Sequence, residues 1–207
     1  MSLRYDEATS VPGAPLVFTF HGIGGACEQY HGFSGLIWPG AAIVSPQCEM
    51  SEMDAARFYA RTPEGAYSLD ELAERAAEMA VFVAEHKARL SPSRVIGLGY
   101  SNGANILAAT LFAQPDLFDD VVLMHPRVSW PTNLGRSLQG KRALITGGRA
   151  DQICPLPLVE TLADTMTQAG ANVQTHLHED GYEVARSEID AITSFAQRAG
   201  TSSQRVA

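Results

Sequence analysis

The sequence is poor in the features that mark secreted, membrane-spanning and disulfide-rich proteins. Cysteine occurs only three times in 207 residues, at Cys27, Cys48 and Cys154. An odd number at such wide spacing fits neither a disulfide framework nor a Cys-x-x-Cys metal site. No run is long and apolar enough to span a bilayer, and residues 1–12 lack a basic region followed by an apolar run. We therefore expect free thiols, no signal peptide and a cytoplasmic location.

Positive charge is also scarce. The chain has 15 Lys and Arg against 23 Asp and Glu, a formal net charge of -8 at pH 7. This balance argues against nucleic acid or an anionic membrane surface as a partner. Hydrophobic residues make up 45% of the chain, which is typical of a globular protein with a full core. We predict one domain over residues 1–198, a frayed tail at 199–207 and a small-molecule substrate, and leave a homodimer open.

Short apolar runs alternate with helical patterns along most of the chain. Strands are predicted at residues 15–20, 41–44, 94–98, 121–124, 143–146 and 172–177, and helices at 68–91, from 102, at 156–169 and at 183–198. Residues 45–65 have no periodicity and are expected to form a long surface loop. The alternation predicts a single α/β domain with a mostly parallel sheet covered by helices on both faces. Ligands of such sheets bind beyond the carboxyl ends of the strands.

One predicted strand end carries the motif Gly-Tyr-Ser-Asn-Gly at residues 99–103, directly before a helical run. A serine at a sharp strand-to-helix turn is held in a strained backbone conformation that lifts its hydroxyl above the sheet. The flanking glycines avoid collisions with the strand and the helix. We therefore predict Ser101 as a nucleophile. The alternative is a glycine-rich turn with an ordinary helix-capping serine.

Four further motifs accompany the serine motif. They are His-Gly-Ile-Gly-Gly at residues 21–25, Arg-Phe-Tyr at 57–59, Gly-Gly-Arg-Ala-Asp at 147–151 with Pro155 and Pro157 beyond, and Gly-Tyr-Glu-Val at 181–184. In this order, and over nearly the whole chain, they resemble the α/β-hydrolase phospholipase/carboxylesterase family, which includes acyl-protein thioesterases and small bacterial carboxylesterases. The resemblance implies an α/β-hydrolase fold and a Ser-Asp-His triad that acts on carboxylic esters or thioesters.

The resemblance also assigns roles to the other motifs. The backbone N–H groups of Ile23 and Asn102 would hold the oxyanion, while Gly22 and Gly24 let their loop approach the substrate. Asp151 follows a strand and a Gly-Gly turn, where its carboxylate would orient a base. The alternatives are a plain glycine turn and a solvated aspartate in a polar turn.

The catalytic base is the departure from the family pattern, because Tyr182 stands where relatives carry histidine. A phenol has a pKa near 10 and is a poor acceptor for the serine proton at neutral pH. His178 is a candidate substitute, and His125, which ends a predicted strand, is another. The alternative is that His176 and His178 are surface histidines on an edge strand. His176, His178 and Asp180 have the side chains of a metal site, but no other ligand converges on them, and we predict neither metal nor cofactor.

These observations leave two functional hypotheses. The first is a serine hydrolase of carboxylesterase or thioesterase type, with an atypical or weakened triad. The second is a catalytically silent relative that keeps the pocket and binds a small molecule or a protein partner. The joint presence of nucleophile turn, glycine loop and acid favours the first, and the absent histidine favours the second.

Overall fold

A seven-stranded sheet forms the centre of the protein, as seen in a computed structural model that describes residues 4–47, 50–52, 55–59, 68–129 and 137–202. In sheet order the strands are β1 (Tyr5–Ala8), β3 (Ala42–Pro46), β2 (Leu16–Phe20), β6 (Val95–Tyr100), β7 (Asp120–Met124), β8 (Arg142–Gly148) and β9 (Asn172–His178). Only β1 runs antiparallel to its neighbour, at one edge. The predicted α/β class with a mostly parallel sheet is confirmed.

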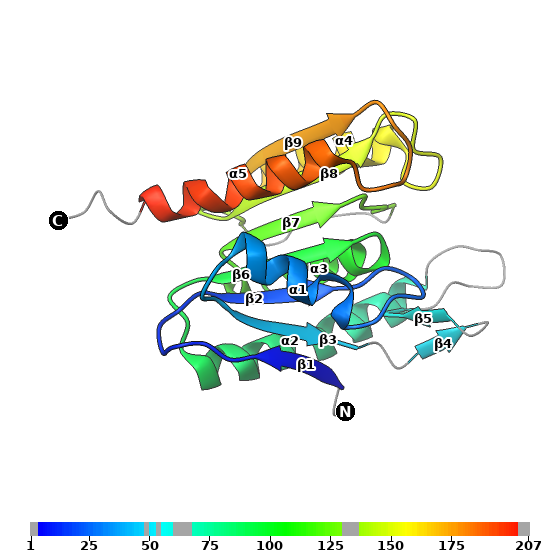
Figure 1. The fold of residues 1–207 in the computed structure, drawn as a ribbon. Helices are drawn as coiled ribbons and strands as arrows, with labels where there is room; N and C mark the ends of the chain where they lie inside the picture. Colours follow the sequence, from blue (N-terminus) through cyan, green and yellow to red (C-terminus); the bar gives the residue numbers. More distant parts are fainter. Residues whose placement is uncertain (1–3, 48–49, 53–54, 60–67, 130–136, 203–207) are drawn as a thin grey trace.

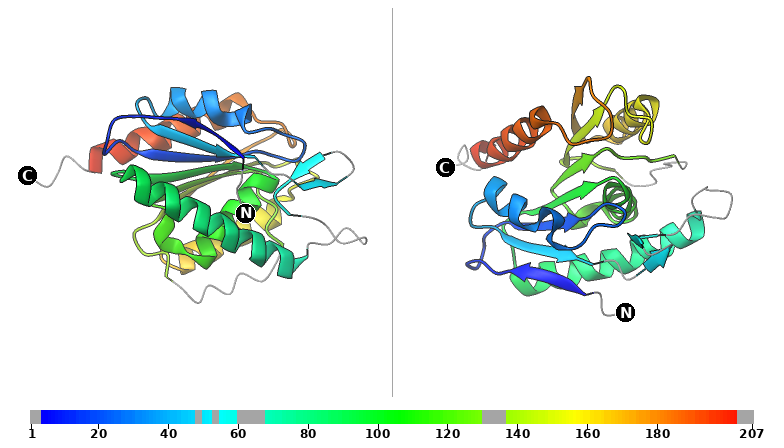
Figure 2. Two further views of the ribbon diagram at one scale, coloured as in Figure 1. Left: turned by 90° about the horizontal axis from the view of Figure 1, so that it is seen from below. Right: turned by 45° about the vertical axis from the view of Figure 1, so that its right-hand side comes forward.

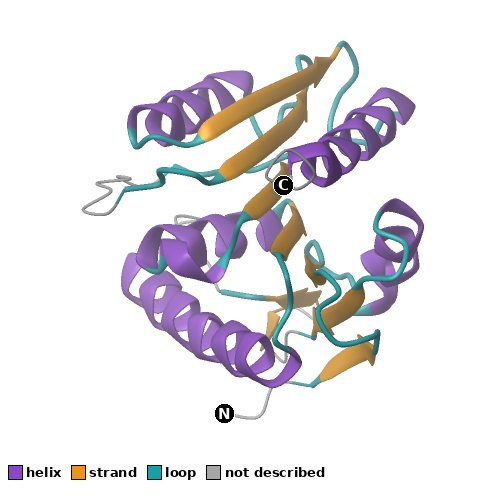
Figure 3. Cartoon of the chain, turned by 90° about the vertical axis from the view of Figure 1, so that its left-hand side faces the viewer, coloured by secondary structure: helices purple, strands orange, loops and turns teal. Residues whose placement is uncertain are grey.

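Helices cover both faces of the sheet (Figures 1 and 2). On one face lie α2 (Leu69–Leu90), α3 (Asn102–Ala113) and α4 (Leu156–Gln168); on the other lie α1 (Glu28–Ile37) and α5 (Arg186–Ser202). A short 3-10 helix, η1 (Pro115–Leu117), follows α3. Figure 3 shows the strands enclosed between these two layers.

The core has two parts, one on each face of the sheet. Successive side chains of a strand point to opposite faces, and on β2 Phe18 enters the core beneath α2 and α3, while Val17 enters the core beneath α1 and α5. Both side chains are fully buried. Strands buried on both faces require the continuous apolar runs that made β2, β6, β7 and β8 visible in the sequence.

Most predicted elements are present, with shifts at their ends. The α2 helix starts after Ser68, whose hydroxyl accepts a 3.4 Å hydrogen bond from the backbone N–H of Glu71, and it ends at Ser91 in the left-handed conformation. The α5 helix begins three residues later than expected and continues to Ser202, into the segment expected to fray; residues 203–207 lie outside the described part.

Besides the short η1, four elements were not anticipated: the strands β1, β4 (Met50–Glu52) and β5 (Ala55–Arg57) and the helix α1. The expected loop at 45–65 contains a hairpin of β4 and β5, whose strands are too short to produce a periodic pattern. Strand β1 is a half-exposed edge strand of mixed polarity, and α1 has only a weak apolar face. Residues 60–67, the rest of the expected loop, are not described. Among the described helices, none combines the length and apolar character that a bilayer crossing requires.

Candidate active site

Ser101 lies at a sharp turn between β6 and α3. Its φ of 53° and ψ of −113° are strained for a non-glycine residue, and its backbone N–H donates a 2.8 Å hydrogen bond to the carbonyl of Met124. A Cβ on Gly103 would lie 2.1 Å from the carbonyl oxygen of Phe20, and one on Gly99 would lie 2.6 Å from that of Gly103. The turn can therefore form only with glycine at both flanking positions, as the motif predicts.

The serine borders a cavity of about 160 Å³ at the carboxyl ends of the strands. Its wall consists of Ile23, Arg57, Tyr59, Ser101, Asn102, Asn105, Arg127, Ile153, Cys154 and Tyr182. Ser101, Ile23 and Asn102, predicted as nucleophile and oxyanion donors, thus share one cavity. Within the described residues, the backbone N–H groups of Ile23 and Asn102 donate no hydrogen bond. Both groups are therefore available to an oxygen of a bound ligand.

The glycine-rich loop is tied down on both sides of Ile23. The backbone N–H of Gly22 donates to Oε1 of Gln29 at 3.0 Å, and that of Gly24 donates to the carbonyl of Ala56 at 2.9 Å. Gly24 has a φ of 71°, which favours glycine, and a Cβ on Gly22 would press on the ring of Tyr100. These contacts hold the loop over the end of β6.

Two asparagines on α3 position the opposite wall. Oδ1 of Asn102 accepts a 2.8 Å hydrogen bond from the backbone N–H of Phe58. Asn105 donates to the hydroxyl of Tyr59 at 2.8 Å and accepts from the backbone N–H of Arg127 at 2.7 Å. The helix that begins at the nucleophile turn therefore also places the aromatic and arginine side chains around it.

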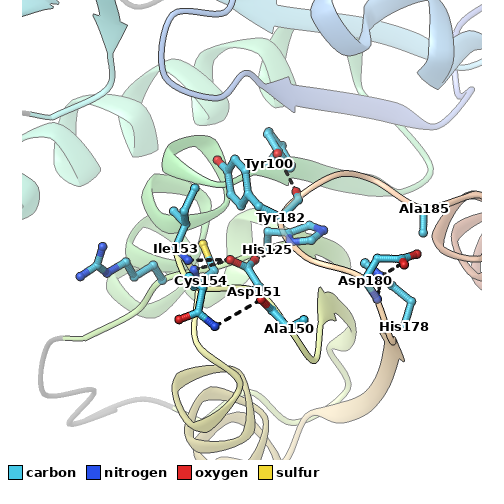
Figure 4. Close-up of polar contacts among 12 residues, drawn as sticks. Tyr100, His125, Ala150, Asp151, Ile153, Cys154, His178, Asp180, Tyr182 and Ala185 are labelled. Carbon is cyan, nitrogen blue, oxygen red and sulfur yellow. Dashed lines mark hydrogen bonds and ion pairs between the residues drawn. The ribbon is translucent and has the colours of Figure 1, made fainter.

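Asp151 is buried and fully engaged by hydrogen bonds. Its Oδ1 accepts from the backbone N–H groups of Ile153 at 2.7 Å and Cys154 at 2.8 Å, and its Oδ2 lies 2.8 Å from Nδ1 of His125. Figure 4 shows these contacts. The predicted orienting acid is therefore fixed at the sheet edge, and the imidazole that it holds is His125.

His125 is completely buried between two carboxylates. Besides its bond to Asp151, its Nε2 lies 3.2 Å from Oε1 of Glu188. Burial disfavours the imidazolium, but Glu188 and Asp151 outweigh this effect and raise the pKa of His125. Burial alone would raise the pKa of Glu188, but the hydrogen bond from His125 and other nearby donors outweigh burial, so this pKa is lowered. A positive φ of 46° at His125 adds backbone strain of the kind that clusters at functional sites.

Tyr182 occupies the space beside the serine. It lines the same cavity as Ser101, and the hydroxyl of Tyr100 donates to its carbonyl at 3.1 Å. Burial raises the pKa of Tyr182, and the neighbouring hydroxyls of Ser101 and Tyr100 only partly oppose that rise. The phenol thus keeps its proton at neutral pH, so it can donate to the serine oxygen but cannot take the serine proton.

His178 faces away from this cavity. Its Nε2 lies 3.1 Å from Oε1 of Glu188, its Nδ1 accepts a 3.2 Å hydrogen bond from the backbone N–H of Asp180, and it does not line the cavity. In Figure 4 His178 and Asp180 lie apart from Asp151, Ile153 and Cys154. A base role for His178 therefore finds no support in its contacts. His176 lies outside the group of nearby ligand atoms formed by His125, His178 and Glu188.

Glu188 and Arg127 were missed in the sequence, although each left a signal. Glu188 lies four and seven residues before Ile192 and Phe195, on the apolar face of the predicted helix, where a carboxylate requires a buried partner. Arg127 follows a strand end by three residues, where ligand-binding side chains of parallel sheets gather.

Comparisons with known proteins place this geometry in a family context. Residues 47–198 match the model of the dienelactone hydrolase family. The chain is 26% identical over 197 residues to a Bacillus subtilis (strain 168) protein named "Putative hydrolase MhqD", with 94% of this chain and 97% of that protein covered.

Two solved structures extend the likeness. The protein Atu2452 of Agrobacterium tumefaciens str. C58, described as of unknown function, matches with a TM-score of 0.91 and 39% identity over 95% of this chain and 96% of its own. The Bacillus cereus carboxylesterase matches with a TM-score of 0.89 and 27% identity over 95% and 94%. The expected α/β-hydrolase fold is confirmed.

Proposed function

Because the chain belongs to the dienelactone hydrolase family, we propose that it cleaves carboxylic esters or thioesters with Ser101 as the nucleophile. The chain is a hydrolase of the dienelactone hydrolase/carboxylesterase type. One observation carries the proposal that Ser101 is the nucleophile. The strained turn presents Ser101 to a cavity that it shares with two backbone N–H groups that donate no hydrogen bond to any described residue, those of Ile23 and Asn102.

In the proposed reaction the Ser101 oxygen attacks the carbonyl carbon of the substrate. The N–H groups of Ile23 and Asn102 stabilise the negative oxygen that develops, helped by the N-terminal end of α3. The alcohol or thiol leaves with a proton, and water then hydrolyses the acyl-serine to release the acid. Each step needs a proton acceptor or donor, and Tyr182 supplies only a donor near neutral pH. We therefore expect turnover several orders of magnitude below that of a complete triad.

Two arginines in the wall suggest the kind of substrate. The Nε of Arg127 is buried and has no hydrogen-bond partner among the described residues, and Arg57 lines the same cavity. A buried guanidinium N–H without a partner is costly, whereas a carboxylate or phosphate on the substrate would accept from it. We propose a small ester that carries an anionic group.

A silent binding protein remains the second candidate, and one observation favours it. Two of the three groups of a triad have other neighbours: Ser101 has the phenol of Tyr182 beside it in the cavity, and Asp151 is bonded to His125. In that case the cavity would bind an anionic ligand without cleaving it.

A fluorophosphonate probe and p-nitrophenyl acetate distinguish the two candidates. Enzymatic function predicts slow covalent labelling and measurable ester turnover in the wild type, both lost in Ser101→Ala. Ser93→Ala, at an exposed serine remote from the cavity, is the matched control and should behave as wild type. A wild type that is folded by circular dichroism but neither labelled nor active would contradict the enzymatic proposal and favour the binding function.

A further inference from the structure

A second group of polar side chains lies behind the proposed active site, where β7, β9 and α5 meet. His125 follows the last residue of β7, His178 ends β9, and Glu188 lies in the first turn of α5. All three are buried, with exposed fractions of 0%, 8% and 0%. Each offers a metal-ligating atom, and these atoms lie within 4.8 Å of one another. The end of β7 and the distant, consecutive elements β9 and α5 thus bring two imidazoles and one carboxylate to a single point.

The hydrogen bonds of this cluster are unevenly distributed. Oε1 of Glu188 accepts from the backbone N–H of Ala185 at 2.8 Å and also faces Nε2 of His125 at 3.2 Å and Nε2 of His178 at 3.1 Å. Oε2 of the same carboxylate makes no direct hydrogen bond among the described residues, although the buried hydroxyl of Thr146 is near enough to help lower the pKa of Glu188. The contact of His178 with Glu188 lacks hydrogen-bond geometry. A fully buried carboxylate oxygen and imidazole nitrogen left in this way are costly unless something else binds them.

We propose that His125, His178 and Glu188 bind a zinc ion through the two Nε2 atoms and the Glu188 carboxylate. In tetrahedral coordination, zinc lies about 2.0–2.1 Å from each nitrogen or oxygen ligand atom. Neighbouring ligand atoms are then roughly 3.3 Å apart. The two nitrogen–oxygen distances of 3.2 and 3.1 Å match that spacing. Imidazole and carboxylate donors suit zinc better than magnesium or calcium, which prefer oxygen ligands alone.

The surroundings fit a metal-binding imidazole. Nδ1 of His125 lies 2.8 Å from Oδ2 of Asp151, the carboxylate–histidine arrangement that orients a ligand and increases its basicity. Oδ2 of Asp180 lies 3.8 Å from Nδ1 of His178 and is the acceptor available when that nitrogen carries the proton. The hydrogen bond from the backbone N–H of Asp180 to Nδ1 of His178 would then be lost. This requires only a small shift of Asp180, whose side chain is exposed on a turn.

The ion would reach the site past His178, the only member with measurable exposure. The adjoining turn carries Glu179 and Asp180, whose side chains are 87% and 82% exposed. Their negative charges raise the local concentration of cations. Bound zinc would fasten the end of β9 and the start of α5 to β7, which fixes the loop that carries Tyr182. The inference does not depend on the proposed ester hydrolysis.

Zinc titration of chelator-treated protein tests the site directly. We expect one zinc per chain with a dissociation constant of roughly micromolar or lower, and a cobalt complex with the intense visible absorption of tetrahedral coordination. Replacing His178 by Gln or Glu188 by Gln should weaken zinc binding at least about 100-fold. The matched control is His176→Gln, two residues earlier on β9 and outside the cluster, which should bind like the wild type.

Asp180→Asn keeps the inference testable if the cluster variants fail to fold. Removing an outer carboxylate partner should weaken zinc binding by about 10- to 100-fold without removing a ligand. X-ray absorption of the loaded wild type should show nitrogen and oxygen neighbours and no sulfur. No saturable zinc uptake, or equal affinities in folded His178→Gln and His176→Gln, would overturn the assignment.

Discussion

Oδ2 of Asp151 lies 2.8 Å from Nδ1 of His125, so the acid expected to orient a catalytic base is bonded to a buried imidazole at the end of β7. The same imidazole faces Glu188. Two buried carboxylates therefore face one imidazole, which links the sheet edge at Asp151 to the start of α5.

The first prediction concerns the stability that this imidazole provides. His125→Leu removes the imidazole that both buried carboxylates face, so Asp151 keeps only backbone N–H donors and Glu188 keeps His178 as its neighbour. We expect it to lower the free energy of unfolding by about 3–5 kcal/mol. His125→Asn, whose amide can still donate to Asp151, should lose clearly less. Urea denaturation of metal-free protein measures both losses. Equal losses in the two variants would show that lost volume, and not the lost donor, is responsible.

The second prediction is a pH profile. Because the pKa of Tyr182 is raised, the phenol stays protonated through neutral pH and supplies no base. The rate of serine labelling in the wild type should therefore keep rising into the alkaline range, without a plateau near pH 7. Tyr182→His should introduce a plateau above the pKa of the new imidazole, near 6.5. A wild-type plateau at neutral pH would reveal a base that we have not identified.

The third prediction concerns the nucleophile turn. A Cβ at Gly103 would lie 2.1 Å from a backbone oxygen of β2, so Gly103→Ala must displace either α3 or the strand. We expect a loss of at least about 2 kcal/mol in the free energy of unfolding, together with loss of serine labelling. Gly32→Ala, in α1 with open space around its Cβ, is the control and should be neutral or stabilising by about 0.5–1 kcal/mol. A Gly103→Ala protein that labels at the wild-type rate would contradict the account of the turn.

The fourth prediction tests the role of Arg127, one of the two arginines that line the cavity. Arg127→Gln should lower kcat/KM for an ester bearing a carboxylate by about 10- to 100-fold, the usual effect of losing a hydrogen bond to a charged group. A neutral ester of the same size should be affected little. Arg149→Gln, at an exposed arginine paired with Glu179 outside the cavity wall, serves as the control. Equal effects of Arg127→Gln on both esters would contradict the proposal that the substrate carries an anionic group.

The sequence was informative where backbone geometry dictates the residue type. Ser101 between Gly99 and Gly103 has steric requirements that only this motif meets, so the turn was visible without a structure. The continuous apolar runs of the buried strands likewise allowed the parallel sheet to be predicted. The position of Tyr182 beside Ser101 followed from the resemblance to the family.

The sequence was uninformative where a contact depends on which elements meet in space. His125 and Glu188 are 63 residues apart, and their contact arises because β7 and α5 pack at the same sheet edge. His178 is the last residue of β9, and its contact with Glu188 arises because the start of α5 lies beside the end of that strand, which spacing could not determine. The β4–β5 hairpin was missed because strands of three residues show no periodicity.

The account depends most on the claim that Ser101 is correctly presented and lacks only a base. The decisive measurement is the second-order rate constant of fluorophosphonate labelling at Ser101, determined by intact mass and peptide mapping for wild type, Tyr182→His and Tyr182→Phe. An imidazole at position 182 should accelerate labelling by about 100-fold or more over Tyr182→Phe, since general-base catalysis contributes this much. Equal rates in folded Tyr182→His and Tyr182→Phe, or an adduct on a residue other than Ser101, would contradict the account.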